Sequence, residues 1–268
     1  MTRFIHLTDL HISHPDASDN KDTATALQSL HRAIAAINAM DPQPDFVVAS
    51  GDLTNLGDVA SYTLLKQTLA PLKAPLIPAL GNHDKRAGFH EVFGAGASDA
   101  LLFSSQARAG LHVIVLDTLV PNHVAGTIED AQFAMLEDAL RQHSDLPKVI
   151  VMHHPPRLDE ADLPWASIDM AATTRLAEVL KPHWVAAILS GHIHINRTSL
   201  WHGMPILVST GLDSTIDLLE RTDLRILEGA GFTICTYRDS GITASYVSLL
   251  PEARELGVIE RARLLKFT

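Results

Sequence analysis

Short apolar runs rich in Val, Ile and Leu recur along this chain of 268 residues, and turn residues bound each of them. Such runs are typical of strands that are buried on both faces of a sheet. Stretches with the apolar spacing of a helix separate several of the runs, and this alternation predicts an α/β architecture. The expected strands lie at residues 4–8, 46–50, 76–80, 113–116, 149–152, 185–189 and 206–209.

Three helices are expected between these strands. The first covers residues 22–40, where leucine and isoleucine residues line one face. The second begins near Thr127, which we expect to be its N-cap. The third covers residues 170–180 and ends before Pro182, because proline cannot continue a helix.

The pattern changes after Gly203, where strands dominate. Runs at residues 206–209, 232–237 and 244–249 predict a more antiparallel ending, and residues 252–266 predict a last helix.

One large domain over residues 1–268 is expected, because the chain only slightly exceeds the usual size of a domain. Its core would span residues 1–210. Residues 211–231 would form a surface insertion.

Composition and charge exclude several classes of protein. A formal charge of -10 argues against binding of nucleic acid polymers, which select basic surfaces. Apolar stretches are too short to cross a bilayer, and residues 1–6 lead straight into Asp9, which leaves no room for a signal peptide. The single cysteine, Cys235, is expected to be a buried structural thiol. We therefore expect a cytoplasmic protein without a membrane partner.

Polar fragments that are rich in metal-ligand residues follow five of the predicted strands. They are Asp9-Leu10-His11, Gly51-Asp52, Gly81-Asn82-His83-Asp84, His153-His154-Pro155-Pro156 and Gly191-His192-Ile193-His194. Ligands of open α/β sheets bind beyond the carboxyl ends of the strands, so all five fragments can converge on one rim. His192 and His194 are expected to face the same side of an extended segment.

The side chains of these fragments fit a site for two metal ions. Carboxylate, imidazole and amide oxygen suit Mn, Fe or Zn, and seven ligands exceed what one ion needs. Asp52, in a tight turn, can offer one oxygen to each ion. Taken singly, Asp9, Asp52 and Asn82 also fit ordinary turn residues, and only their joint arrangement favours the metal site. The candidate ligands are Asp9, His11, Asp52, Asn82, His153, His192 and His194.

The five fragments, in this order, resemble the calcineurin-like metallophosphoesterases. Within that superfamily, residues 1–210 look most similar to the bacterial class III cyclic nucleotide phosphodiesterases and the related glycerophosphodiesterases. The resemblance implies a four-layer αββα sandwich with two central mixed β-sheets.

The same resemblance implies a role for each candidate residue. His83 would lie beside the scissile phosphate, and Asp84 would orient its ring, which makes His83 and Asp84 the candidate catalytic residues. The first ion would be held by Asp9, His11, Asp52 and His194, and the second by Asp52, Asn82, His153 and His192.

The expected activity is hydrolysis of a small phosphodiester, either a cyclic nucleotide or a glycerophosphodiester, by attack of a metal-bound hydroxide. His83 would give a proton or positive charge to the leaving oxygen, and Asp84 would favour its imidazolium form. A phosphomonoesterase using the same ligands and a catalytically silent, metal-supported binding scaffold are the alternatives. A nuclease is disfavoured by the acidic charge.

Several further residues have open roles. His154 is expected to support the ligands or face the substrate, and Asp117 to support the site or cap a loop. Residues 155–167 are a candidate functional loop, in which Trp165 either packs or stacks on a base. Residues 211–231 are a candidate surface for self-association into a homodimer or higher homo-oligomer, as related enzymes often form.

Overall fold

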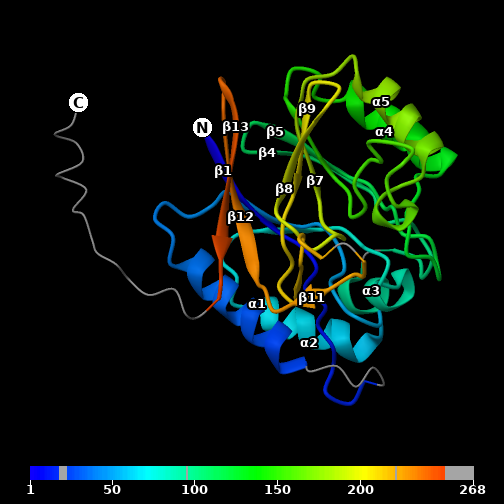
Figure 1. Ribbon diagram of the computed structural model, residues 1–268. Coiled ribbons are helices and arrows are strands. Elements are labelled where there is room, and N and C mark those ends of the chain that lie inside the picture. The colour runs from blue at the N-terminus through cyan, green and yellow to red at the C-terminus, as the bar shows by residue number, and fades with distance from the viewer. Residues whose placement is uncertain (18–22, 95, 221, 251–268) are drawn as a thin grey trace.

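The structure is a computed structural model, and it describes residues 1–17, 23–94, 96–220 and 222–250 (Figure 1). Each strand and helix expected above within these residues is present, with ends that differ by a few residues. The predicted helix at residues 252–266 lies outside the described residues.

The first sheet has five strands in the order β13-β12-β1-β2-β3. Strands β1, β2 and β3 are parallel, whereas β12 pairs antiparallel with both β1 and β13. The strands of this sheet are β1 (Thr2–Leu7), β2 (Phe46–Ala49), β3 (Leu76–Pro78), β12 (Gly231–Arg238) and β13 (Gly241–Ser248).

The second sheet has six strands in the order β4-β5-β6-β7-β9-β8. Its four central strands are parallel, and antiparallel strands form both edges. For residues 206–209 we expected antiparallel pairing. This is correct for the pairing of β9 with the edge strand β8, but wrong for its pairing with β7, to which β9 runs parallel. The strands are β4 (Ser104–Arg108), β5 (Leu111–Val115), β6 (Lys148–Val151), β7 (Val185–Ser190), β8 (Arg197–Trp201) and β9 (Met204–Val208).

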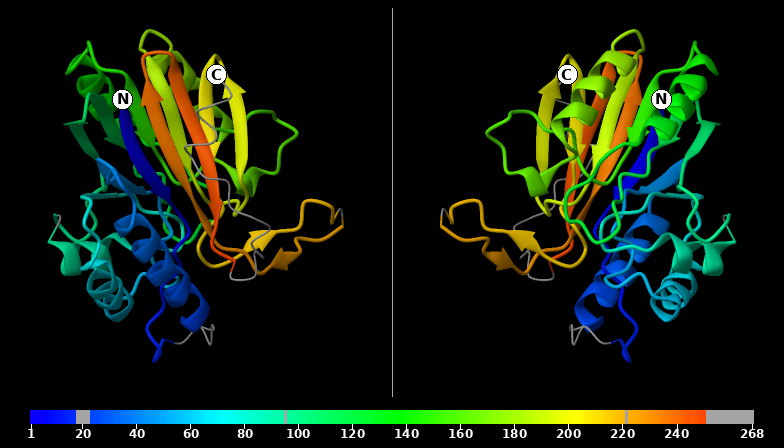
Figure 2. Two further views of the ribbon diagram at one scale, coloured as in Figure 1. Left: turned by 90° about the vertical axis from the view of Figure 1, so that its left-hand side faces the viewer. Right: turned by 90° about the vertical axis from the view of Figure 1, so that its right-hand side faces the viewer.

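Helices cover the outer face of each sheet (Figures 1 and 2). The first sheet packs against α1 (Thr23–Asn38), α2 (Val59–Leu69) and α3 (Arg86–Phe93), and the second packs against α4 (Asp130–Arg141) and α5 (Met170–Leu180). The inner faces of the two sheets meet in a third apolar core that includes Phe4 and Phe46 from one sheet and Val149 and Leu189 from the other. The four layers confirm the expected αββα sandwich.

The N-cap expected at Thr127 is wrong. Helix α4 begins three residues later, after Glu129, which makes no side-chain cap. The Thr127 hydroxyl instead donates a hydrogen bond to Asp169. Asp169 is the N-cap of α5 and accepts from the backbone N–H of Ala172, so Thr127 helps to hold the start of a different helix.

The expected insertion at residues 211–231 contains a small two-stranded ribbon, β10 (Thr215–Ile216) and β11 (Ile226–Leu227). This hairpin projects from the body of the molecule (Figure 2). Within the described part of the chain, the helices lack the length and apolar character needed to span a membrane.

Candidate metal centre

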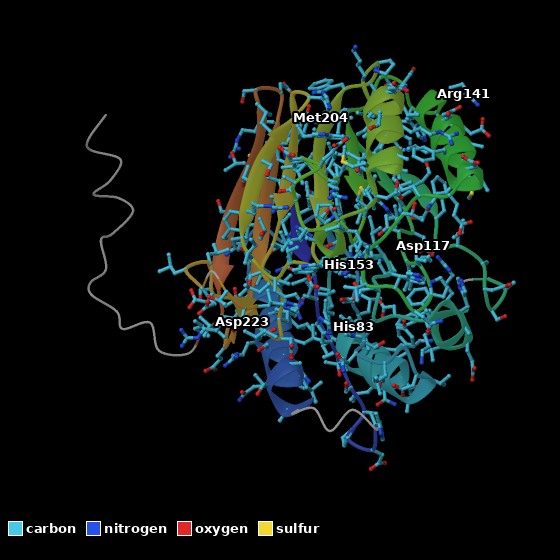
Figure 3. The ribbon with its side chains drawn as sticks, turned by 45° about the vertical axis from the view of Figure 1, so that its right-hand side comes forward. His83, Asp117, Arg141, His153, Met204 and Asp223 are labelled. Atoms are coloured by element: carbon cyan, nitrogen blue, oxygen red, sulfur yellow. The ribbon has the colours of Figure 1, made fainter. Side chains whose placement is uncertain are left out.

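The five polar fragments meet at one rim, just beyond the carboxyl ends of β1, β2, β3, β6 and β7. Asp52 connects fragments of the two sheets: one oxygen accepts the backbone N–H of His83 at 2.9 Å, and the other lies 3.2 Å from Nε2 of His153. Figure 3 labels His83 and His153 in the middle of the molecule, where the sheets come together. The predicted convergence is therefore present.

Most of the candidate ligands adopt a left-handed backbone conformation. L-residues rarely adopt this region, which costs about 1 kcal/mol per residue and must be maintained by the surrounding structure. The extended segment expected around His192 and His194 is consequently wrong, because the backbone of both residues is left-handed. The φ angles are 48° at Asp9, 45° at His11, 47° at Asp52, 72° at His192 and 49° at His194.

Glycine is required at the start of both Gly-led tetrapeptides because other fragments approach so closely. A Cβ atom at Gly191 would meet the Thr8 hydroxyl and the Asp9 carboxylate, and one at Gly81 would meet the Asp52 carboxylate. The backbone N–H of His192, next to Gly191, donates to both oxygens of Asp9 at 3.1 and 3.0 Å. The glycines thus allow backbone and carboxylates to share the rim.

The ligands expected for the first ion form a tight group. Nε2 of His194 lies 3.2 Å from both Oδ1 of Asp9 and Nε2 of His11. Nε2 of His11 also lies 3.6 Å from Oδ2 of Asp52. Two imidazole nitrogens and two carboxylates therefore point at one small volume.

The ligands expected for the second ion adjoin the first group through Asp52. Nε2 of His153 lies 3.2 Å from Oδ2 of Asp52 and 4.0 Å from Oδ1 of Asp9. The rings of His153 and His192 meet edge to face, with centroids 5.2 Å apart. Asn82 lines the same hollow as Asp52 and His192, which has a volume of about 150 Å³.

Each candidate histidine ligand makes a hydrogen bond to an oxygen atom through one ring nitrogen. Nδ1 bonds to the Asn55 side-chain oxygen in His11, to the Ser50 carbonyl in His153 and to the Ser214 carbonyl in His194, each at 3.1 Å. His192 differs, because its Nε2 donates to the Trp165 carbonyl at 2.6 Å. Histidines that bind metals are generally oriented by such outer hydrogen bonds.

The carboxylates and histidines of the rim shift one another's pKa values. Burial alone would raise the pKa of Asp9 and of Asp52, yet the neighbouring His194 and His153 lower both below the ordinary range. Burial would lower the pKa of the two histidines, but Asp52 raises that of His153 to about 9, and Asp9 raises that of His194 to about 8. The rim is thus built to keep its carboxylates ionised.

The donor set also fits cations because it leaves polar atoms unsatisfied within the described residues. Oδ1 of Asn82 is buried and has no hydrogen-bond partner there. Such orphaned atoms are rare in folded proteins and carry a cost unless an ion or water satisfies them. Groups of residues whose ligand atoms all lie within 4.8 Å of one another include Asp9 with His11 and His194, and Asp9 with Asp52 and His153.

Asp84 does not orient the His83 ring as expected. Its buried carboxylate accepts hydrogen bonds from the backbone of Leu53, Thr54 and Gly81 and from the hydroxyl of Tyr62 at 2.8 Å. Burial, reinforced by the negative charge of Asp52, raises the pKa of Asp84 to about 6. Asp84 therefore braces the loops that carry Asp52 and Asn82.

The His83 ring is held by Asn55, a residue that sequence reasoning missed. Nδ1 of His83 donates to the Asn55 carbonyl at 3.0 Å, while the Asn55 side chain binds His11. Nothing in the sequence around Asn55 distinguishes it from a turn residue, so only the fold reveals that it serves two site histidines.

The structure shows which groups contact His154, Asp117 and Trp165, whose roles the sequence left open. His154 is buried and pairs with the Thr118 hydroxyl and the Val124 carbonyl, so it supports the rim from outside. Asp117 caps its loop by accepting from the backbone N–H of Leu119, and it also forms an ion pair with Arg86. Trp165 lines the hollow at the metal centre, with its ring edge to face with His192.

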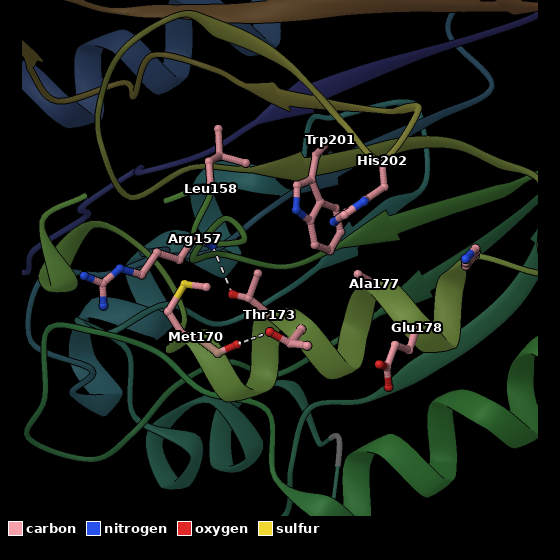
Figure 4. A pocket seen from close by; sticks show the side chains of 10 residues that line it. Arg157, Leu158, Met170, Thr173, Ala177, Glu178, Trp201 and His202 are labelled. Carbon is pink, nitrogen blue, oxygen red and sulfur yellow. Dashed lines mark hydrogen bonds between the residues drawn. The ribbon is translucent and has the colours of Figure 1, made fainter. Parts of the chain in front are cut away.

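Another hollow, of about 500 Å³, lies between α5 and the turn at Trp201 and His202 (Figure 4). Its lining residues include Met170 and Thr173 and draw on none of the candidate metal ligands.

Comparison with known proteins agrees with this geometry. The chain belongs to the calcineurin-like phosphoesterases, because the model of that family matches residues 2–196. A probable cyclic nucleotide phosphodiesterase of Rhodococcus erythropolis is 33% identical, over 91% of this chain and 83% of that protein. A probable glycerophosphodiester phosphodiesterase of Arcobacter nitrofigilis is 27% identical, over 74% of each chain.

Solved structures agree on the fold. A dimetal phosphatase of Danio rerio superposes with a TM-score of 0.66 at 12% identity, over 92% of this chain and 98% of that one.

Proposed function

We propose that this protein is a metal-dependent phosphodiesterase that hydrolyses a small phosphodiester at the rim. The observation that carries the proposal is the convergence of three oxygen-bearing and four imidazole side chains around Asp52, with His83 beside them. The names of its relatives support a diester substrate, either a cyclic nucleotide or a glycerophosphodiester.

Seven candidate ligands would hold two ions of the Mn, Fe or Zn type, with Asp52 shared between them. They are Asp9, His11, Asp52, Asn82, His153, His192 and His194. When bound, the ions supply positive charge at the phosphoryl oxygens and generate a nucleophile at neutral pH.

His83 would donate a proton to the leaving group. Since its Nδ1 is engaged by the Asn55 carbonyl, Nε2 is the ring atom left to face the substrate. In the imidazolium form, this N–H can protonate the departing alkoxide as the P–O bond breaks. The hydroxyl of a water molecule forms the new bond to phosphorus as the old P–O bond breaks, and the remaining proton of that water restores the imidazolium form of His83. Asp84 would act indirectly, through the loops that it braces.

A panel of substrates tests the proposal. With Mn²⁺ added, the protein is expected to hydrolyse bis-p-nitrophenyl phosphate and at least one of 3′,5′-cAMP, 2′,3′-cAMP and glycerophosphocholine. The expected rate on p-nitrophenyl phosphate, a monoester, is lower. Faster hydrolysis of the monoester would make the protein a phosphomonoesterase, and absence of turnover with Mn²⁺, Fe²⁺ and Zn²⁺ would favour a binding scaffold.

A further inference from the structure

The hollow at the metal centre has one polar side and one apolar side. Its polar lining consists of four candidate ligands, together with His83 and Ser214: Asp52, Asn82, His192 and His194. Five apolar residues also line the hollow, and they come from three separate segments of the chain: Val124, Trp165, Ile216, Leu224 and Ile226. Apolar lining beside a few convergent polar groups is typical of a pocket for an organic ligand.

Several of these apolar side chains face solvent. Val124 is 54% exposed, Leu224 is 55% exposed and Ile226 is 64% exposed. Ile216 and Ile226 are direct partners across the β10–β11 ribbon, so their side chains lie on the same face of it. Exposed apolar side chains gathered around one hollow indicate a surface that a ligand covers.

Each apolar segment is tied to a histidine of the rim. The hairpin is fixed to His194, because the Ser214 carbonyl accepts from Nδ1 of that ring and the Thr215 hydroxyl donates to its backbone carbonyl at 2.8 Å. The Trp165 carbonyl binds His192, and the Val124 carbonyl lies 2.9 Å from Nε2 of His154. The apolar wall is therefore held in a fixed position relative to the metal ligands.

The charge around the wall selects against an anionic group. The apolar side continues outward into a hollow of about 430 Å³ that shares Trp165 and Leu224. Acidic residues contribute to this outer hollow, namely Asp217, Glu220 and Asp223, of which Asp217 forms an ion pair with Arg225 at 3.3 Å. Among the described residues that line either hollow, none is Lys or Arg. An additional negative charge on the substrate would be repelled here.

A second hollow also reaches His83 and Asn82. It has a volume of about 360 Å³, and its lining combines charged residues such as Lys85 and Arg86 with apolar residues such as Leu119. The two hollows therefore meet at Asn82 and His83.

We propose that the β10–β11 hairpin, with Val124 and Trp165, is the subsite for one organic portion of the substrate, and that this portion carries no negative charge and is apolar or aromatic. The inference rests on the proposed function, since it places one organic portion of a phosphodiester bound at the rim. Leu224 and Ile226 are then determinants of specificity.

Two matched phosphonates test the subsite without requiring turnover. Phenylphosphonate and methylphosphonate carry the same charged group and differ in the apolar ring. Calorimetry on the Mn²⁺-loaded protein is expected to give about tenfold tighter binding of phenylphosphonate, from burial of part of the ring. Equal affinities would overturn the proposal.

A double substitution in the hairpin should remove this difference. In Leu224→Ser/Ile226→Ser, the two phosphonates should bind with affinities within about twofold of each other, because the apolar contact is lost. The matched control is Leu219→Ser, at a residue that is 88% exposed on the same hairpin and outside both hollows. A preference retained in the double variant, or lost equally in the control, would contradict the assignment. Near-UV circular dichroism and the melting temperature check that the variants fold.

Hydrolysis of bis-p-nitrophenyl phosphate separates failure of this inference from failure of the proposed function. Turnover without a preference for phenylphosphonate refutes only the subsite. A preference for phenylphosphonate without turnover of any diester refutes only the phosphodiesterase.

Discussion

The two sheets supply different chemistry to the rim. The first sheet contributes all three candidate oxygen ligands, from Asp9, Asp52 and Asn82, together with the candidate ligand His11. The second sheet contributes only imidazoles, from the histidines of two fragments, His153, His192 and His194. Neither sheet alone carries a mixed set of ligands large enough for two ions.

The division of ligands also explains the charges at the rim. Carboxylates of the first sheet face histidines of the second, so His194 and His153 lower the pKa of Asp9 and Asp52, and these carboxylates in turn raise the pKa of the histidines. Unpaired buried charges would be costly on either side. Each sheet thus stabilises the charged groups of the other, and the site depends on their packing.

Removing the shared carboxylate should have the largest effect. Asp52→Ala deletes the contact between His83 on the first sheet and His153 on the second, and it is expected to empty or mispopulate both ion positions. Loss of the several kcal/mol that the ions contribute would lower kcat by more than about a thousandfold. Elemental analysis that still finds two tightly held ions per chain would contradict the shared role.

Removing His83 should lower kcat without changing the metal content of the protein. His83→Ala is expected to lower kcat on a substrate with a poor leaving group by about a hundredfold, because the departing alkoxide loses its proton donor. Both ions should stay bound, since the predicted ligands are intact. An unchanged kcat, or loss of metal in elemental analysis, would eliminate this role.

Substitution of Asn55 tests whether the hydrogen bond that orients His11, the histidine of the first sheet, matters for the site. Asn55→Ala removes the acceptor of His11 Nδ1 and should lower metal affinity or kcat by about tenfold. Asn55→Asp keeps an acceptor oxygen and is the matched control. Equal losses in the two variants would show that the hydrogen bond to His11 is not what matters.

His6 should give the smallest effect, on stability alone. Burial lowers its pKa to about 4, although Asp9 acts in the opposite direction. The unfolded chain then binds the proton more readily, so stability is lost as pH falls from the ordinary value of 6.5 toward 4. Between pH 6.5 and 5.5 this group should cost about 1 kcal/mol of unfolding free energy.

Urea unfolding of the metal-free protein at these two pH values, compared with His6→Gln, measures the difference. The variant should lose about 1 kcal/mol less than the unsubstituted protein over the same interval. Identical losses would mean that His6 does not titrate as its burial requires.

Where an element buries a continuous apolar stretch, it could be predicted from the sequence. Helix α5 lies at the expected residues and ends before Pro182, as predicted, and in the structure it buries Leu176 and Leu180. Helix α2 was missed, since part of what it buries is polar, namely Ser61, Thr68 and the Tyr62 hydroxyl that binds Asp84. Edge strand β8 was missed too, because its exposed residues give it a weak apolar signal.

The same contrast holds for the site. The candidate ligands at the strand ends could be predicted, because each lies in a short fragment whose residue spacing is local in the sequence. The role of Asp84 could not be predicted, because four of the five hydrogen bonds that it accepts come from residues at least 22 positions away in the chain. The contacts of the Asn55 and Trp165 carbonyls with His83 and His192 could not be predicted at all, because every residue has a backbone oxygen and the sequence does not show which one is used.

The division of ligands between two sheets has a mechanical consequence. His11 and His194 are separated by 183 positions in the chain, yet their ring nitrogens lie 3.2 Å apart. An ion held by both would act as a reversible cross-link that closes a very long loop, and such links restrict the unfolded chain most. Metal supply would then set the lifetime of the folded protein as well as its rate of catalysis, and chelation would expose the chain to proteases as it stops the reaction.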